Sequence, residues 1–254
     1  MTKRSIPALL REGAAELCSL VAPRECPCGA DGAWLCPQCR RLLRATPVRV
    51  DGACTALQML WAARLLPEHG LPAGADYRSL LPVLALGPYQ GPLKNLVLAW
   101  KNGGAAHLTR PLGEGIAPAV SALGPRGVQL AAVPSRLAAR LRRGEDHTLE
   151  LARVLAAQGV GTVMPARAVV ATGQEGRDAR DRRERRIHLR PRPGIARARA
   201  QDTEWERSSG VVIVDDVVTT GSTLRAMHEA LTSAGHQVLG AVVIAAARIP
   251  SPGP

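Results

Sequence analysis

Two adjacent aspartates, Asp215 and Asp216, follow the β-branched run Val211–Val214 and precede a loop of hydroxyl residues. The run predicts a strand buried on both faces of a parallel sheet. The loop predicts a helix start, where free backbone N–H groups and the helix dipole attract an anion. Carboxylates repel a phosphate, so their partners should be neutral hydroxyls or a metal ion. A ribose with a 5′-phosphate satisfies both groups, and the stretch therefore predicts a sugar-phosphate site.

The loop that follows the acid pair excludes several other phosphate sites. Its hydroxyls can donate hydrogen bonds, and its glycine lets the backbone approach a ligand closely. No lysine follows the glycine, as a P-loop requires, and the Gly-x-Gly-x-x-Gly of dinucleotide folds is missing. Phospho-receiver domains carry their acid pair near the start of the domain, whereas here it lies near the end of the sequence. An ordinary helix after a strand is the remaining alternative. The loop residues are Thr219, Thr220, Gly221, Ser222 and Thr223.

Periodic patterns predict the elements that position this stretch. Apolar residues at helical spacing indicate helices over residues 93–102, 146–159 and 222–234, with Asp146 as an N-cap. Apolar runs indicate strands over 128–133, near Ala168, over 211–214 and over 237–247. This alternation predicts an α/β fold with a mostly parallel sheet. Ligands of such sheets bind beyond the carboxyl ends of the strands.

Composition and charge limit the partners of the protein. The formal net charge is +12, and residues 177–199 hold ten arginines against three acids. Such a run is a solvated segment, an anion-binding loop or a nucleic-acid patch. With no Phe and two Tyr, an aliphatic core is expected, and contacts with nucleic acid should involve phosphates rather than stacked bases. Short apolar runs and a charged N-terminal stretch predict a soluble, cytoplasmic protein without a membrane span.

Residues 211–223 resemble the phosphoribosyl-pyrophosphate motif of type I phosphoribosyltransferases in the apolar run, both acids and the Thr-Thr-Gly-Ser-Thr loop. The wider order is a cysteine cluster, "YQGPLKNLVLAWKNGG", "VPSRLAARLRRGEDHTLELARVLA", the arginine-rich stretch and the motif. It is similar to the ComF family of competence-associated phosphoribosyltransferase-like proteins. The resemblance implies a type I phosphoribosyltransferase-like sheet flanked by helices, with a small zinc-binding head. The implied divisions are a head over 1–47, a connector over 48–88, and a domain over 89–248 with a mobile arginine-rich segment over 173–209.

The resemblance also implies roles for single residues. Asp215 and Asp216 would be the catalytic acids and hold the ribose hydroxyls, directly or through water on Mg²⁺, while residues 219–223 hold the 5′-phosphate. Where relatives read Arg-Gly-Phe-Asn-Gln, this chain reads Arg-Gly-Glu-Asp-His over residues 143–147. The implied pyrophosphate contacts are Lys101, Ser135, Arg136, Arg140 and Arg143.

The cysteine cluster resembles the zinc ribbon-like head of the same family, in which paired knuckles bind one Zn²⁺ through thiolates. The second knuckle, "CPQC", is intact, whereas the first, "CPC", is one residue short, and Cys18 is close enough to replace a ligand. Free buried thiols are the alternative. The implied ligands are Cys26, Cys28, Cys36 and Cys39.

Two functions from different classes fit these patterns. The first is an enzyme that binds phosphoribosyl pyrophosphate with Mg²⁺ and transfers, or hydrolyses, the phosphoribosyl group. The second is a non-catalytic adaptor in DNA uptake or processing that binds single-stranded DNA or a helicase partner, as the association of the family with competence implies. A basic surface does not distinguish these two functions, because pyrophosphate and DNA are both anions that bind cationic side chains.

Overall fold

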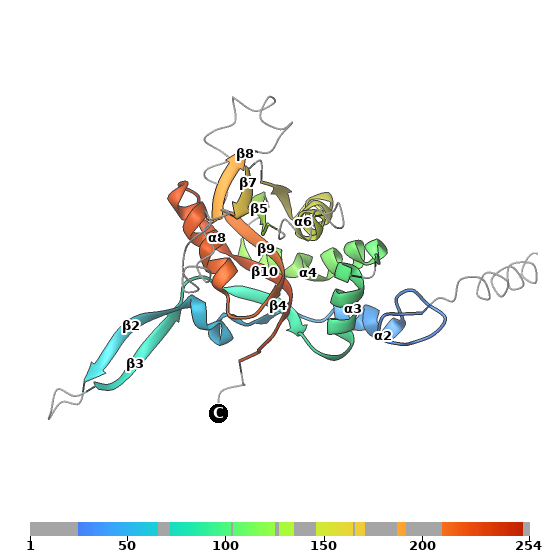
Figure 1. Ribbon diagram of the computed structural model, residues 1–254, viewed down its shortest axis with the longest axis horizontal. Coiled ribbons are helices and arrows are strands. Elements are labelled where there is room, and N and C mark those ends of the chain that lie inside the picture. The colour runs from blue at the N-terminus through green and yellow to red at the C-terminus, as the bar shows by residue number, and fades with distance from the viewer. Residues whose placement is uncertain are drawn as a thin grey trace, which may run out of the picture.

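The computed structural model describes residues 25–65, 72–102, 104–124, 127–134, 146–164, 166–170, 187–191 and 210–250. A six-stranded sheet in the order β1-β4-β10-β9-β5-β6 forms the centre of this part of the chain (Figure 1). All neighbours in the sheet are parallel except β1, which runs antiparallel to β4. The predicted α/β fold with a mostly parallel sheet is therefore confirmed. The strands are β1 (Val48–Arg49), β4 (Val83–Pro88), β5 (Val128–Ala132), β6 (Gly161–Val163), β9 (Val211–Val218) and β10 (Val238–Ala246).

Helices cover both faces of the sheet. On one face, α3 (Gly91–Asn102), α4 (Thr109–Leu123) and α6 (His147–Ala157) pack against Val212 and Val214 of β9. On the other face, α8 (Ser222–Ser233) packs against Val211 and Ile213. Alternate residues of the same strand thus enter two apolar layers, which explains why β9 reads as a continuous apolar run. The three helices predicted from periodicity are α3, α6 and α8.

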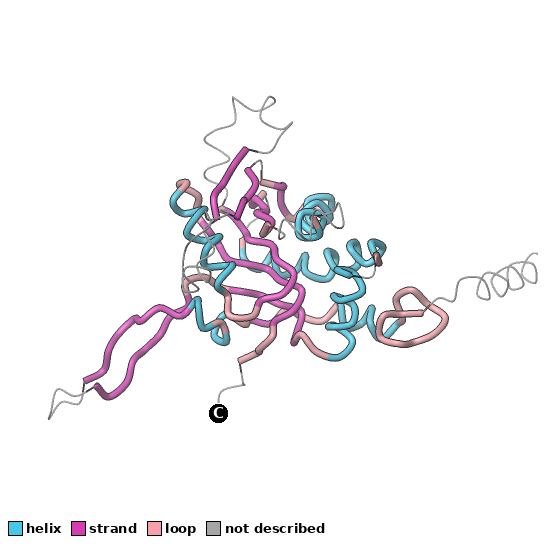
Figure 2. The backbone as a smooth tube through the Cα atoms, viewed as in Figure 1, coloured by secondary structure: helices cyan, strands magenta, loops and turns pink. Residues whose placement is uncertain are grey.

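Two smaller ribbons lie outside the central sheet. β2 (Gln58–Leu65) and β3 (Pro72–Ser79) form an antiparallel hairpin that extends away from the body (Figures 1 and 2). The strand predicted near Ala168 is β7 (Ala166–Val170), but it pairs with β8 (Ile187–Pro191) and not with the central sheet. The apolar run near Ala168 predicted strand β7 correctly. The strand that pairs with β7 is β8, which belongs to the arginine-rich segment, where periodicity predicted no strand.

The cysteine-containing segment packs directly on the body of the fold. Its helix α2 (Pro37–Leu43) contributes Cys39 and Leu43 to the same apolar layer as α4. A Cβ on Gly115 of α4 would lie 2.7 Å from the Leu43 carbonyl oxygen, so glycine lets the two helices approach. In the described part of the chain, no helix has the length and apolar character to cross a membrane.

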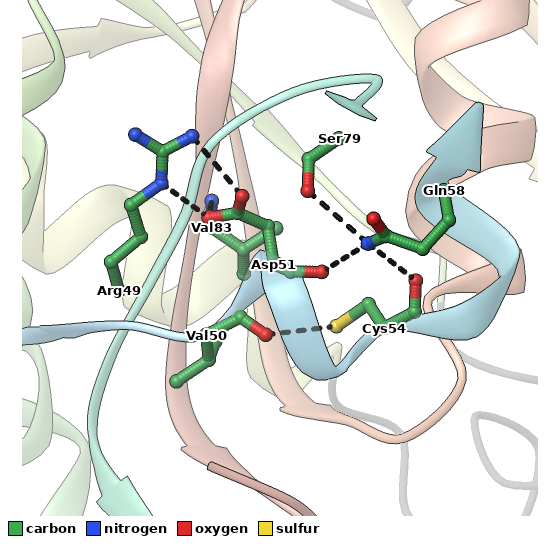
Figure 3. A network of polar contacts seen from close by, with 7 residues as sticks. All are labelled: Arg49, Val50, Asp51, Cys54, Gln58, Ser79 and Val83. Atoms are coloured by element: carbon green, nitrogen blue, oxygen red, sulfur yellow. Dashed lines mark hydrogen bonds and ion pairs between the residues drawn. The ribbon is translucent and has the colours of Figure 1, made fainter. Parts of the chain in front are cut away.

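A buried carboxylate joins the first strand to the start of β4 (Figure 3). Asp51 is 3% exposed and belongs to the short helix η1 (Asp51–Ala53). Arg49 donates two hydrogen bonds to its carboxylate, at 2.7 and 3.1 Å, and the Val83 amide donates a third at 3.2 Å. Burial acts to raise the pKa of Asp51, but the hydrogen bonds from Arg49, Ser79 and Val83 outweigh it and hold the pKa below its ordinary value.

The same region anchors the base of the β2–β3 hairpin. The Gln58 amide donates to the Asp51 carbonyl oxygen at 2.7 Å and to the Cys54 carbonyl oxygen at 3.3 Å, and it lies 3.2 Å from the Ser79 hydroxyl (Figure 3). The Leu80 amide donates to the carbonyl oxygen of Leu57 at 2.8 Å. The hairpin is therefore fixed at its root by side-chain and backbone hydrogen bonds.

Asp51→Asn should lower the free energy of unfolding by about 1–3 kcal/mol at pH 7, since the charged partner of Arg49 is lost. The folded pKa of Asp51 is depressed, so the contribution of the carboxylate is present above the unfolded pKa of about 3.9 and is lost as pH falls through the folded pKa. Urea unfolding of the wild type and of Asp51→Asn is measured between pH 3 and pH 7. The difference between their free energies of unfolding should become smaller below about pH 4. A difference independent of pH, or equal loss in the control Asp31→Asn at an exposed acid, contradicts this role.

Candidate functional site

The acid pair lies inside β9 and not after it. β9 runs to Val218 because its pairing with β10 continues past the acids, with Asp215 opposite Val243 and Val218 opposite Ala246. The strand is thus longer than the run of four β-branched residues predicted. Asp215 is 8% exposed, and its carboxylate accepts a hydrogen bond from the Asp216 amide at 2.8 Å.

The two carboxylates have different surroundings. The Asp216 carboxylate accepts from the Val217 amide, at 2.6 Å, and its other oxygen lies 2.6 Å from the Lys101 ammonium. The Asp216 side chain is 17% exposed and that of Lys101 is 31% exposed, so a ligand can reach this ion pair. Lys101 belongs to the last turn of α3. The structure therefore brings together two predicted site residues that are far apart in the sequence.

The predicted phosphate loop connects β9 to α8. Gly221 is the N-cap of α8 and has φ +83°, a conformation that favours glycine, and no side chain caps this helix. Thr219, Thr220 and Ser222 are exposed. The Ser222 amide lies 3.4 Å from the Thr220 hydroxyl, a long contact that an anion can replace. The loop thus presents hydroxyls and a helix N-terminus on the surface next to the acid pair.

Residues 54–57 support the loop from behind. The Ala56 amide donates to the Thr220 carbonyl oxygen at 2.9 Å. A Cβ on Gly221 would lie 2.8 Å from Cγ of Leu57 and 3.1 Å from Cβ of Cys54. Arg225 of α8 donates to the Ala56 carbonyl oxygen at 3.2 Å. Sequence reasoning missed these residues, because the short helix η2 (Thr55–Leu57) has no periodicity that links it to the loop.

A pocket of about 350 Å³ opens beside the loop. Arg248 lines it together with Thr219 and Thr220. Arg248 follows the end of β10, at the same edge of the sheet as the loop, and was not predicted as a site residue. A cation after the last apolar residue of a parallel strand is the sequence signal that could have found it. The other lining residues are Ala53, Thr55 and Ala247.

The predicted pyrophosphate loop leaves the sheet next to the acid pair. The Val133 amide, just after β5, donates to the Val214 carbonyl oxygen at 2.9 Å. Thr148 in the first turn of α6 donates to the Val133 carbonyl oxygen at 2.6 Å, so the end of β5 and the start of α6 are held together. The predicted contacts Ser135, Arg136, Arg140 and Arg143 lie outside the described residues.

The start of α6 also contacts the helix that carries Lys101. The ring of His147 lies 5.0 Å from that of Trp100, and its buried Nε2 atom has no hydrogen-bond partner among the described residues. Asp146 is at the predicted N-cap position, but its side chain does not cap α6 and instead lies 2.9 Å from the Thr148 hydroxyl. These contacts hold the start of α6 against the last turn of α3.

The four predicted zinc ligands converge on one point. Their sulfur atoms all lie within 4.8 Å of one another, and Cys28 Sγ is 3.6 Å from Cys36 Sγ. Four thiolates around a tetrahedral Zn²⁺ at about 2.3 Å are separated by about 3.8 Å, so the arrangement fits the ion. Gly29, with φ +91°, turns the short first knuckle back so that both of its sulfurs reach the centre.

Hydrogen bonds and burial act differently on the cluster thiols. The Cys39 amide donates to Cys36 Sγ at 3.4 Å, and this contact is the main reason that the pKa of Cys36 falls to about 7. Burial raises the pKa of Cys39. A thiolate is the form that binds zinc, and the Cys36 thiol is more easily deprotonated at neutral pH than the Cys39 thiol. Cys18 lies outside the described residues, and four other cysteines already offer four sulfur atoms.

Comparison with known proteins gives one match. Residues 134–251 match the family model of the phosphoribosyl transferase domain. This range includes β9, the loop and α8, and it begins where the predicted pyrophosphate loop leaves β5. No curated protein matches the chain. The match supports a phosphoribosyltransferase-like protein of type I, in which a four-cysteine cluster precedes the matched domain.

Gly221→Ala should destabilise the protein more than the same substitution at Gly235. Both glycines have φ near +83°, so both variants lose about 1–2 kcal/mol to backbone strain. A Cβ at residue 235 meets nothing within 4 Å, whereas at residue 221 it collides with Leu57. Chemical unfolding should therefore give a clearly larger loss for Gly221→Ala. Equal losses would show that the loop does not depend on its close approach to residues 54–57.

Cys39→Ser should remove bound zinc and lower the thermal midpoint. Cys39 is fully buried in the apolar layer that also contains α4. Loss of this sulfur should therefore loosen the cysteine-containing segment where it packs on the core. Zinc content is measured by elemental analysis, and stability by calorimetry. Cys54→Ala is the matched control, because Cys54 is equally buried but outside the cluster. It should keep one zinc per chain, and zinc retained at full stoichiometry by Cys39→Ser contradicts the assignment.

Proposed function

We propose that the protein binds phosphoribosyl pyrophosphate at the carboxyl edge of β9 and transfers its phosphoribosyl group. The observation that carries this proposal is the junction of β9 and α8, where a part-exposed acid pair is followed at once by a hydroxyl-rich helix start. This junction lies inside the range that matches the phosphoribosyl transferase domain. A 5′-phosphate on the helix start leaves the ribose within reach of the acids.

Each group in the site has a distinct task in this proposal. Backbone amides at the start of α8 and the hydroxyls of Thr219, Thr220 and Ser222 bind the 5′-phosphate. Asp216 is the better exposed acid and accepts from the ribose hydroxyls, while the buried Asp215 orients the strand end through the Asp216 amide. Lys101 exchanges its contact with Asp216 for the pyrophosphate when the ligand enters. Ser135, Arg136, Arg140 and Arg143 are proposed as further pyrophosphate contacts.

The reaction breaks the bond between C1 of the ribose and the pyrophosphate oxygen. Positive charge develops on the ribose ring, and negative charge gathers on the leaving group. The carboxylates therefore stabilise the ring side, and Lys101 and the arginines stabilise the leaving group. The carboxylate oxygens next to a polyphosphate fit Mg²⁺, which when bound neutralises the pyrophosphate and polarises the breaking bond. The acceptor is a nucleophile that attacks C1, or water in a hydrolytic reaction.

The four-cysteine cluster is proposed to hold a structural Zn²⁺. Three of its cysteines are buried, and four thiolates leave no open position on a tetrahedral ion. The ion would fix a loop that has few apolar residues of its own. The ComF family and a context of DNA uptake remain part of the proposal, supported by the order of the sequence motifs.

A groove favours the second candidate, an adaptor that binds single-stranded DNA or a helicase. It has a volume of about 930 Å³ and lies between the cysteine-containing segment and α4. Trp34 is 49% exposed there and meets the ring of His107 edge-on at 5.6 Å. Exposed aromatic rings beside cations are typical of single-strand binding. Composition predicted few such platforms, so this candidate depends on the single exposed ring of Trp34. The cations of the groove are Arg40, Arg44 and Arg110.

Titration calorimetry with phosphoribosyl pyrophosphate and Mg²⁺ tests the proposal. Asp215→Asn/Asp216→Asn should weaken binding by about 100-fold or more, because each lost charged hydrogen bond is worth about 1.5–3 kcal/mol. Glu114→Gln/Glu150→Gln adds the same charge on the exposed faces of α4 and α6 and should leave the affinity unchanged. Absence of binding by the wild type refutes a sugar-phosphate site. Three results together support the adaptor. The protein binds single-stranded DNA with a steep dependence on salt, this binding is unchanged by the acid substitutions, and Trp34→Ala abolishes it.

A further inference from the structure

The β2–β3 hairpin, residues 58–79, is here called the arm. It projects from the body of the protein, as Figures 1 and 2 show. Its large apolar side chains are among the most exposed of the described residues. The exposed fractions are 47% for Met59, 61% for Leu60, 63% for Trp61 and 61% for Tyr77. Isolated side chains of this kind are common on surfaces, but four on one two-stranded ribbon indicate a contact.

Both faces of the arm carry these side chains. Leu60 is directly opposite Tyr77 in the register of the ribbon, so the two share one face. Met59 is opposite Arg78 and therefore lies on the other face, where the Arg78 guanidinium sits 3.8 Å from the centre of the Trp61 ring. A two-stranded ribbon with neither face covered is only marginally stable in water. The arm thus needs further strands or another surface to shield it.

The free edge of β2 is protected against strand pairing only in part: Arg64 is charged, and the register with β3 shifts between Leu60 and Ala62 and between Arg64 and Leu65. Among the described residues, β2 pairs only with β3, so one of its edges is open. Residues 59–63, Met-Leu-Trp-Ala-Ala, contain no charge, proline or glycine. Natural edge strands usually carry such residues to block association. β3, in contrast, has Pro72, Asp76 and Arg78. The open edge of β2 is therefore suited to accept another strand.

Charge favours a second copy of this chain as the source of that strand. The protein has a formal net charge of +12, so two copies repel each other over most of their surfaces. Residues 58–79 contain two arginines against one glutamate and one aspartate, which leaves no net charge on the arm. An anionic partner gains nothing from a neutral arm, whereas two copies meet there with the least repulsion.

We propose that two copies of the protein associate through their arms, with the β2 edges paired antiparallel across a two-fold axis. The pairing forms a four-stranded sheet in the order β3-β2-β2-β3. A two-fold contact is self-complementary, so the same edge serves both copies. The hydrogen bonds of Gln58 hold the root of each arm, so each body presents its arm in a fixed direction. The residues that support the phosphate loop lie directly before that root in the sequence.

Sedimentation equilibrium of the full chain over a range of concentrations tests the proposal. The wild type should be a dimer at micromolar concentrations. Leu60→Glu/Trp61→Glu should raise the dissociation constant at least about 100-fold, because each position counts twice in a symmetric dimer. The matched control is Leu98→Glu/Ile249→Glu, which places the same charges on exposed apolar side chains outside the arm and should leave the dimer intact.

A mixing experiment separates a lost contact from a damaged fold. Leu60→Glu and Leu60→Lys variants should each be monomeric at concentrations where the wild type is a dimer. An equimolar mixture should associate again, and added salt should weaken that association. Circular dichroism and zinc content verify that each variant is folded. A wild type that stays monomeric, a dimer insensitive to the arm substitutions, or a mixture that does not associate overturns the proposal.

Discussion

The parallel pairing of β9 with β5 on one side and β10 on the other is the constraint on which the candidate site depends. It aligns the carboxyl ends of three strands, so residues that follow them meet at one edge. Asp216 comes from β9, Arg248 follows β10, and the loop after Val133 follows β5. Because β9 is covered on both faces, its acids cannot turn toward solvent elsewhere. The acids are accessible at the edge of the sheet, where the Lys101 ammonium lies 2.6 Å from a carboxylate oxygen of Asp216.

A second set of contacts places the phosphate loop on that edge. Gly221 permits the backbone to lie against Leu57 and Cys54, and the Ala56 amide binds the Thr220 carbonyl oxygen. The segment that holds the loop is itself held by the buried Asp51 and by Gln58 (Figure 3). The loop, the carboxylate network and the root of the arm therefore form one continuous set of contacts.

The cysteine-containing segment shows how a short loop without its own core is joined to a larger fold. Four sulfurs converge within 4.8 Å, and the helix that follows inserts Leu43 beside Gly115 of α4. Its cysteines belong to the same apolar layer as α3, α4 and α6. The groove with Trp34 and three arginines exists only because this segment packs against α4. The convergence of the four cysteines and the shape of that groove are thus coupled through packing.

The sequence by itself determined the strand–loop–helix around the acid pair, the α/β class, the helices α3, α6 and α8, and the four cysteines of the cluster. These features are local, because periodicity and residue type act over a few neighbouring positions. Only the tertiary structure decided that β9 extends through the acids, that β7 pairs with β8, and that Lys101 reaches Asp216. It also decided that residues 54–57 support the loop and that the arm exposes both faces. Each of these depends on which segments meet across long distances in the chain, and a linear pattern carries no record of such contacts.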